Sequence, residues 1–139
     1  MQNPPPVQTA PATAKSSTGL DENVAALLSY ITWVPGLIFF LIEKDSRLVR
    51  FHAMQSLLLN GGAIVVGIVL WILSFVLLII TAQISGLLST LLSIISGLVA
   101  FVFFIGILIA VILCLIKAYQ GQYFKLPIVG NFAEKFSAK

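Results

Sequence analysis

The feature that most constrains this chain is an uncharged stretch at residues 57–116, sixty consecutive positions without Asp, Glu, Lys, Arg or His. A helix that crosses a lipid bilayer needs only about twenty apolar residues, so the stretch has room for two such helices. A third apolar and uncharged segment, residues 24–42, lies upstream between acidic residues and the pair Glu43 and Lys44. The sequence therefore predicts an all-α integral membrane protein with three transmembrane helices.

Composition supports the same class. The chain has 59% hydrophobic and 9% charged residues and a mean hydropathy of +1.06, which lies outside the range of soluble globular domains. Residues 1–20 have a different composition. They hold four of the six prolines, and Lys15 is their only charged residue. Such a segment buries too little apolar surface to offset the entropy of ordering. We expect a disordered tail at 1–20, a helical membrane domain at 21–125 and a C-terminal tail at 126–139.

Helix length sets the expected spans. A single helix over residues 47–80 would be about 51 Å long, well beyond the roughly 30 Å of hydrocarbon. We therefore expect an interfacial helix at 46–60, capped by Asp45 or Ser46, and spans at 23–43, 62–81 and 95–117. By the same reasoning, we expect a re-entrant or surface helix at residues 82–97 before the third span, although the sequence leaves open whether this helix is re-entrant, on the surface or membrane-spanning. Pro35 predicts a kink near Trp33, either a tolerated membrane-helix proline or a functional hinge.

The basic residues predict an orientation. Lys and Arg occupy positions 15, 44, 47, 50, 117, 125, 135 and 139. With three spans, seven of these positions lie on one side of the membrane and Lys15 lies on the other. Cytoplasmic loops carry the excess of Lys and Arg, so the prediction is an outside N-terminus and a cytoplasmic C-terminus.

Basic, aromatic and polar residues that flank the spans are candidate contacts to anionic lipid or to a membrane-protein partner. They are Lys44, Arg47, Arg50, His52, Gln55, Lys117, Tyr123, Phe124 and Lys125. Each basic residue near an anionic surface contributes about 1 kcal/mol of attraction. The formal charge of +3 is explained by this bias, and we do not expect nucleic-acid binding.

A helical wheel places small and polar residues on one face of the second span and the segment before it. The face consists of Ser56, Asn60, Ala63, Gly67 and Ser74. Small residues let membrane helices approach closely, so this face is a candidate helix-packing surface. The alternative is a hydrated path along the same face.

The sequence predicts no catalytic, cofactor or metal site. His52 is the only histidine and Cys114 the only cysteine, which excludes paired-histidine and cysteine-rich zinc sites. Ser56, His52 and Asp45 could form a triad on paper, but no nucleophile elbow or oxyanion loop accompanies them. No ionisable residue lies at mid-depth in the expected spans, which argues against an ion-coupled carrier.

Two segments carry a family resemblance: STGLDENVAALLSYI followed by WVPGLIFFLIEKDSRLVRFHAMQSLLL, and the closing AYQGQYFKLPIVGNFAEK. They resemble a widespread family of small, uncharacterised bacterial membrane proteins, which is grouped distantly with the Tic-twenty component of the chloroplast protein-import translocon. The resemblance covers about residues 17–135. It implies a helical protein of the bacterial inner membrane, with no catalytic residues to carry over, and a remote connection to protein translocation.

Two functions from different classes follow. The first is a non-enzymatic membrane protein that works by association with itself or with membrane partners. The second is an oligomeric pore or a translocation subunit of the Tic type. The sequence leaves the specific role, the partner and the oligomeric state open.

Overall fold

The structure, a computed structural model, describes residues 14–138. It contains five helices: α1 (Glu22–Leu28), α2 (Trp33–Ile42), α3 (Arg47–Ala82), α4 (Gly86–Tyr119) and α5 (Val129–Ser137). The only extended pairing within the described range is an isolated bridge between Lys15 and Asp21. The predicted all-α class is confirmed.

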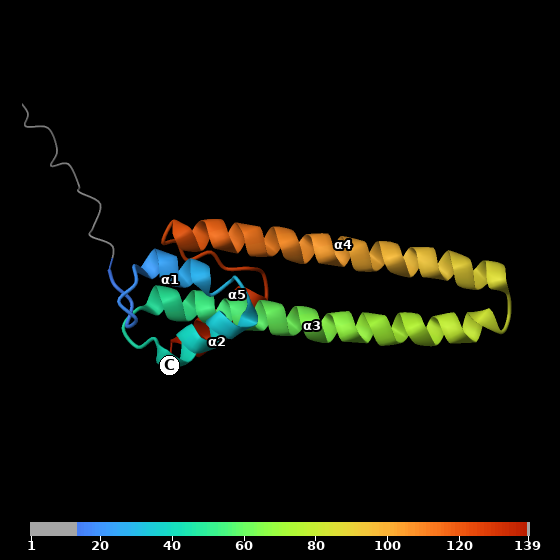
Figure 1. The fold of residues 1–139 in the computed structure, drawn as a ribbon, viewed down its shortest axis with the longest axis horizontal. Helices are drawn as coiled ribbons and strands as arrows, with labels where there is room; N and C mark the ends of the chain where they lie inside the picture. The colour runs from blue at the N-terminus through green and yellow to red at the C-terminus, as the bar shows by residue number, and fades with distance from the viewer. Residues whose placement is uncertain (1–13, 139) are drawn as a thin grey trace, which may run out of the picture.

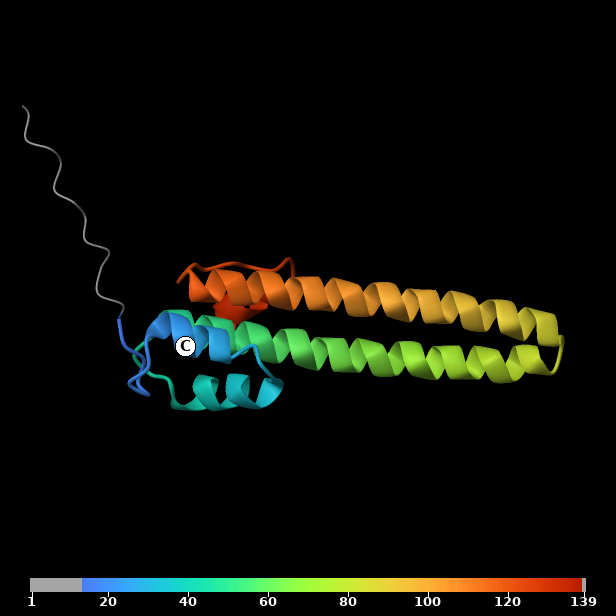
Figure 2. The same cartoon turned by 45° about the horizontal axis from the view of Figure 1, so that its top comes forward.

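Two long helices dominate the shape. α3 has 36 residues and α4 has 34, which corresponds to lengths of about 54 and 51 Å. They run antiparallel, and the three short helices gather where α3 begins and α4 ends (Figures 1 and 2). We call this end, residues 14–60 and 107–138, the head, and the remaining helical hairpin, residues 61–106, the arm.

The arm presents apolar side chains to its surroundings along its whole length. Val65, Trp71 and Val102 are 61, 67 and 68% exposed. By length and composition, α3 and α4 are each able to cross a membrane. The residues 61–82 of α3 alone measure about 33 Å, which matches the hydrocarbon thickness of a bilayer.

The expected first span, residues 23–43, is not one helix. It breaks after Leu28 into α1 and α2, of 7 and 10 residues, and neither is long enough to cross 30 Å of hydrocarbon. Pro35 is the third residue of α2, where a backbone N–H has no intrahelical partner in any case. The predicted kink near Trp33 is therefore a complete break, which lets α2 fold back beside α3 (Figure 2). Three transmembrane helices are not supported.

The expected interfacial helix at 46–60 and the span at 62–81 are one continuous helix, α3. Gly61 and Gly62 do not interrupt it, because a helical glycine costs only about 1 kcal/mol relative to alanine. The limit set by bilayer thickness does not apply to the whole of α3, since its first fourteen residues pack within the head. The helix begins at Arg47 and Ser46 Oγ accepts a hydrogen bond from Val49 N at 3.2 Å, which confirms the predicted cap.

The separate helix expected at 82–97 is likewise part of α4. Polar residues do not end the helix there, because their hydroxyls donate to carbonyls of the preceding turn. Ser89 Oγ and Thr90 Oγ1 lie 2.9 Å from Gly86 O, and Ser93 Oγ lies 2.7 Å from Ser89 O. The helix ends at Tyr119, just before Gly121, whose φ is +68°.

The two ends of the described chain lie at the same end of the molecule. Residues 14–20, expected in the disordered tail, dock against the turn between α2 and α3 through Ser17 and Glu43. The C-terminal residues 129–137 form α5, which packs against α3 (Figure 1). The expectation of an outside N-terminus and a cytoplasmic C-terminus depended on three spans, which the structure does not support, so the orientation stays a prediction. The disorder expected at 1–13 lies outside the described residues.

Candidate functional site

The interior of the head holds a group of polar side chains from two helices and one link, which we call the polar cluster. It consists of Tyr30 after α1, His52 and Gln55 of α3, and Cys114 of α4. His52, Gln55 and Cys114 are fully buried and Tyr30 is 3% exposed. Positions 52 and 55 are one turn apart, so α3 presents both side chains on the same face.

The hydrogen-bond directions in the polar cluster follow from its chemistry. His52 Nε2 lies 3.0 Å from Gln122 O, and a carbonyl can only accept, so Nε2 carries the proton and donates. In the neutral ring, Nδ1 then accepts from the Tyr30 hydroxyl at 3.1 Å. The same hydroxyl accepts from Gln55 Nε2 at 3.0 Å. The side-chain groups of Tyr30, His52 and Gln55 therefore find their hydrogen-bond partners within the protein.

Gln55 ties the C-terminal segment to α3. Its Nε2 donates to Phe124 O at 3.0 Å and lies 3.3 Å from Cys114 Sγ, while its Oε1 accepts from Leu126 N at 3.3 Å. Residues 122–126 have no helix or sheet partner for these backbone groups, and a buried backbone group needs one. The side chains of α3 therefore provide the backbone partners that hold the tail in place.

A second contact joins the link between α1 and α2 to α3. Ser56 Oγ donates to Ser29 O at 2.6 Å. Gly36 lies against the same place, because a Cβ added there would be 3.1 Å from Ser29 O and 3.3 Å from Ser56 Oγ. Close approach of α2 to α3 at this point favours glycine, because an added Cβ would force its neighbours to shift by a few tenths of an ångström.

Glu43 organises the far end of the head. Its side chain is fully buried, and its carboxylate accepts from the backbone N–H of Ser17, Asp45 and Ser46 at 2.9 to 3.1 Å and from Ser17 Oγ at 2.8 Å. Burial by itself would raise the pKa of Glu43, but these donors outweigh it and hold the pKa below its ordinary value of 4.5. The ionised carboxylate therefore stabilises the docking of residues 14–20.

This arrangement predicts a pH dependence. A carboxyl whose pKa is lowered in the folded state stabilises it fully above the unfolded pKa, and the stabilisation is lost as pH falls through the folded pKa. We expect hydrogen-exchange protection of the Ser17, Asp45 and Ser46 amides to be constant above pH 4.5 and to decrease below it. Glu43→Gln should show weak protection at every pH. Unchanged wild-type protection far below that pH would contradict the role of Glu43.

The structure divides the candidate lipid or partner contacts. His52 and Gln55 are buried in the polar cluster, so their predicted contact with lipid or a partner is wrong. The C-terminal segment at residues 122–126 covers both side chains. Lys44, Arg47 and Tyr123 are exposed. The others are engaged within the head or partly covered by it. Lys117 donates to Gln122 Oε1, Lys125 pairs with Glu134, Arg50 lies over the ring of Phe40, and Phe124 is half-buried against the core.

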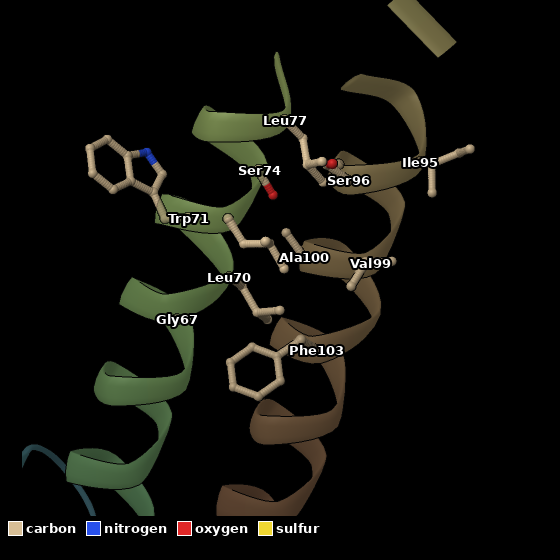
Figure 3. Close-up of a pocket in the computed structure, with 12 residues that line it drawn as sticks. Gly67, Leu70, Trp71, Ser74, Leu77, Ile95, Ser96, Val99, Ala100 and Phe103 are labelled. Atoms are coloured by element: carbon tan, nitrogen blue, oxygen red, sulfur yellow. The ribbon is translucent and has the colours of Figure 1, made fainter. Parts of the chain in front are cut away.

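The residues of the candidate packing face lie partly in the head and partly in the arm. Ser56 is buried in the head and Asn60 Nδ2 donates to Ser56 O within the same helix. Gly67 and Ser74 line a groove between α3 and α4 of about 540 Å³ (Figure 3). From α4 the groove is lined by Ser96, Gly97 and Ala100, among others. Ala63 lies one turn before Gly67 on α3. A role in helix packing stays a prediction.

The described residues of the head do not assemble a catalytic or metal-binding arrangement. Ser56, His52 and Asp45 each have other hydrogen-bond partners, so no triad is assembled. Across residues 14–138, no three His, Cys, Asp or Glu side chains gather where they could hold a metal ion. The polar cluster has no exposed nucleophile, and its geometry fits holding segments together.

Sequence reasoning missed Tyr30, Cys114 and Glu43. Tyr30 carries a usable signal, because a tyrosine hydroxyl in an apolar run usually needs a partner when buried, and His52 and Gln55 are candidates of the right chemistry. Glu43 gives no such signal, since an acidic residue after an apolar segment is equally typical of a solvated turn.

Comparison with known proteins places the chain in a family. Residues 20–133 match the model of a family described as the magnetosome magnetite crystal formation protein family. A UPF0132 membrane protein of Methanocaldococcus jannaschii is 40% identical over 124 residues, which cover 88% of this chain and 94% of that protein. A UPF0132 membrane protein of Archaeoglobus fulgidus is 38% identical over 127 residues, with coverage of 84% and 95%. No solved structure is significantly similar.

These relatives are archaeal, so they do not support the expected bacterial source, and neither they nor the family description mention the Tic-twenty component. They do support a membrane protein without an assigned specific function. Because the family model matches most of its length, the chain belongs to the magnetosome magnetite crystal formation protein family.

Proposed function

We propose that this protein is a non-enzymatic membrane protein whose α3 and α4 cross the bilayer and which works by associating with further copies of itself through the arm. The apolar surface and length of the arm support the crossing. The family description names magnetite crystal formation, whereas the archaeal relatives are described only as membrane proteins. Association within a membrane is a role compatible with both descriptions.

The observation that carries association is a set of arm glycines that packing within one chain does not explain. A Cβ added to Gly67, Gly97 or Gly106 would meet no atom within 4 Å. A helical glycine costs about 1 kcal/mol relative to alanine, and in membranes small residues serve the close approach of another helix. Gly67 and Gly97 line the same open groove, and the occupant that we propose for this groove is a helix of a second copy.

A photocrosslinking amino acid at Leu73 or Ile95, both in the groove lining, tests this proposal in native membranes. We expect capture of a second copy of the chain. Gly97→Leu should abolish the captured dimer by filling the groove. The matched control is Val102→Leu, which enlarges a side chain that is already 68% exposed outside the groove, and it should leave capture unchanged. Capture of lipid alone at both positions would exclude self-association through the groove.

A further inference from the structure

The hydroxyl side chains of the arm helices fall into two groups by their hydrogen bonds. In the larger group, each hydroxyl donates to a carbonyl of the preceding turn of its own helix, at 2.7 to 2.9 Å. These hydroxyls belong to Thr81, Ser89, Thr90 and Ser93. The other two, which we call the groove serines, are Ser74 and Ser96. Neither hydroxyl has a hydrogen-bond partner within residues 14–138, and both lie in the space between α3 and α4 (Figure 3).

The groove serines line the same cavities. Both contribute to the groove of about 540 Å³ and to a second cavity of about 230 Å³ between α3 and α4. Of the described residues that line the larger groove, no other carries a hydroxyl, an amide or a charged side chain. The structure therefore directs two hydroxyls without partners into an otherwise apolar space.

The two groove serines lie at nearly the same depth in the arm. Ser74 is eight residues before the end of α3 at Ala82, and Ser96 is ten residues after the start of α4 at Gly86. At 1.5 Å per residue, these separations are about 12 and 15 Å. The centre of a hydrocarbon layer roughly 30 Å thick is about 15 Å from its edge. When the arm crosses the bilayer, both hydroxyls are therefore near its centre, where water is not available to them.

A hydroxyl at this depth needs a partner, because an apolar surrounding penalises an unsatisfied polar group. The carbonyls four residues earlier, on Leu70 and Leu92, are the local choice, and the structure does not use them. The acyl chains of lipids carry no hydrogen-bonding group. A groove filled by lipid therefore leaves both serines unsatisfied.

A second copy of the chain brings the required groups to the same depth. In an assembly whose rotation axis is parallel to the membrane normal, residues of one copy meet residues of equal depth in its neighbour. A hydroxyl both donates and accepts, so serines of two copies satisfy each other. Gly67, Gly97 and Ala100 of the same groove are small, which lets the neighbouring helix approach to hydrogen-bonding distance.

We propose that the groove serines of neighbouring copies bond to one another near the centre of the membrane, and that these hydroxyl pairs select a second copy of the chain over lipid in the groove. This inference rests on the proposed function, which assigns association to the arm without naming the bonds that hold it.

The first test removes the hydroxyls. The full chain is reconstituted in phosphatidylcholine vesicles over a range of protein-to-lipid ratios, and capture of a second copy is measured with the photocrosslinker at Leu73. Ser74→Ala with Ser96→Ala should raise the ratio at half-maximal capture about tenfold, because two interhelical bonds worth about threefold each are lost. Ser89→Ala with Ser93→Ala removes two hydroxyls that bond within α4 and should leave it unchanged. Ser74→Thr with Ser96→Thr keeps the hydroxyls and should behave as the wild type does.

The second test reports proximity. Chains with Ser74→Cys are mixed with chains with Ser96→Cys, each with Cys114→Ser so that no other thiol is present. Mild oxidation in vesicles should join the two kinds of chain by a disulfide. Chains with Val102→Cys, whose side chain is 68% exposed outside the groove, should stay monomeric under the same conditions.

The outcomes separate this inference from the proposed function. Equal capture in the two alanine double variants overturns the inference, because the groove serines are then satisfied within their own helices, while association through the arm stands. Rapid modification of the Ser74→Cys chain by a membrane-impermeant maleimide also overturns it, because water then reaches the groove. Absence of capture in the wild type at every ratio removes the proposed function itself.

Discussion

Replacing Gln55 with leucine releases the C-terminal segment from α3. Leucine fills a similar volume but leaves Phe124 O and Leu126 N without the partners that Gln55 gives them. Each buried unsatisfied backbone group costs about 1–3 kcal/mol, so the expected loss is roughly 2–4 kcal/mol of unfolding free energy. Hydrogen exchange of the protein in lipid nanodiscs should show faster exchange across residues 122–137 and little change in the arm.

The matched control is Asn60→Leu. Asn60 carries the same amide chemistry on the same helix, but Nδ2 donates only to Ser56 of its own helix, and the residue is half-exposed. We expect a change within about 1 kcal/mol and no effect on residues 122–137. Equal exchange of the tail in both variants would show that Gln55 does not hold it.

Replacing Gly130 with alanine displaces α5. An added Cβ would lie 2.7 Å from Lys125 Cα and 2.9 Å from Lys125 C, and these are backbone atoms that cannot move aside as a flexible side chain would. Relief requires a shift of the turn at Pro127 and Ile128, at a cost of about 1–3 kcal/mol. We expect the protection of amides in α5 to decrease and the ion pair of Lys125 with Glu134 to be lost.

Gly106→Ala is the control for this change. It makes the same chemical substitution in α4, where the new Cβ meets nothing within 4 Å. Removal of a helical glycine should stabilise the helix by about 0.5–1 kcal/mol. The prediction for Gly130 fails if both alanine variants exchange as the wild type does in α5.

The comparison of sequence and structure is most instructive for residues 23–43. Hydropathy marks the segment as apolar, which is correct, but apolar content does not distinguish a span from a helix folded back on its neighbour. Pro35 indicates where the helix stops, and the contacts of Gly36 with Ser29 and Ser56 explain where it goes. The fold-back depends on a fit to α3 that has no signature in the segment itself.

The same limit explains the misassigned candidate contacts. His52 and Gln55 follow a basic loop and were expected to contact lipid or a partner, yet the tail buries them. Their partners lie 70 and 69 residues away in the chain. A polar residue on an amphipathic helix has the same sequence pattern whether water, lipid or a distant backbone segment covers it.

The sequence by itself determined the helical class, the apolar character of the arm and the start of a helix after Asp45 or Ser46. These features depend on neighbours within about four residues, on backbone preference and on the need of uncharged stretches for an apolar environment. Only the tertiary structure decided that the first apolar segment doubles back, that Glu43 holds residues 14–20 and that the tail closes over the polar cluster. The physical reason is that hydrogen-bond partners of buried polar groups are chosen by the packing of distant segments, which local pattern does not encode.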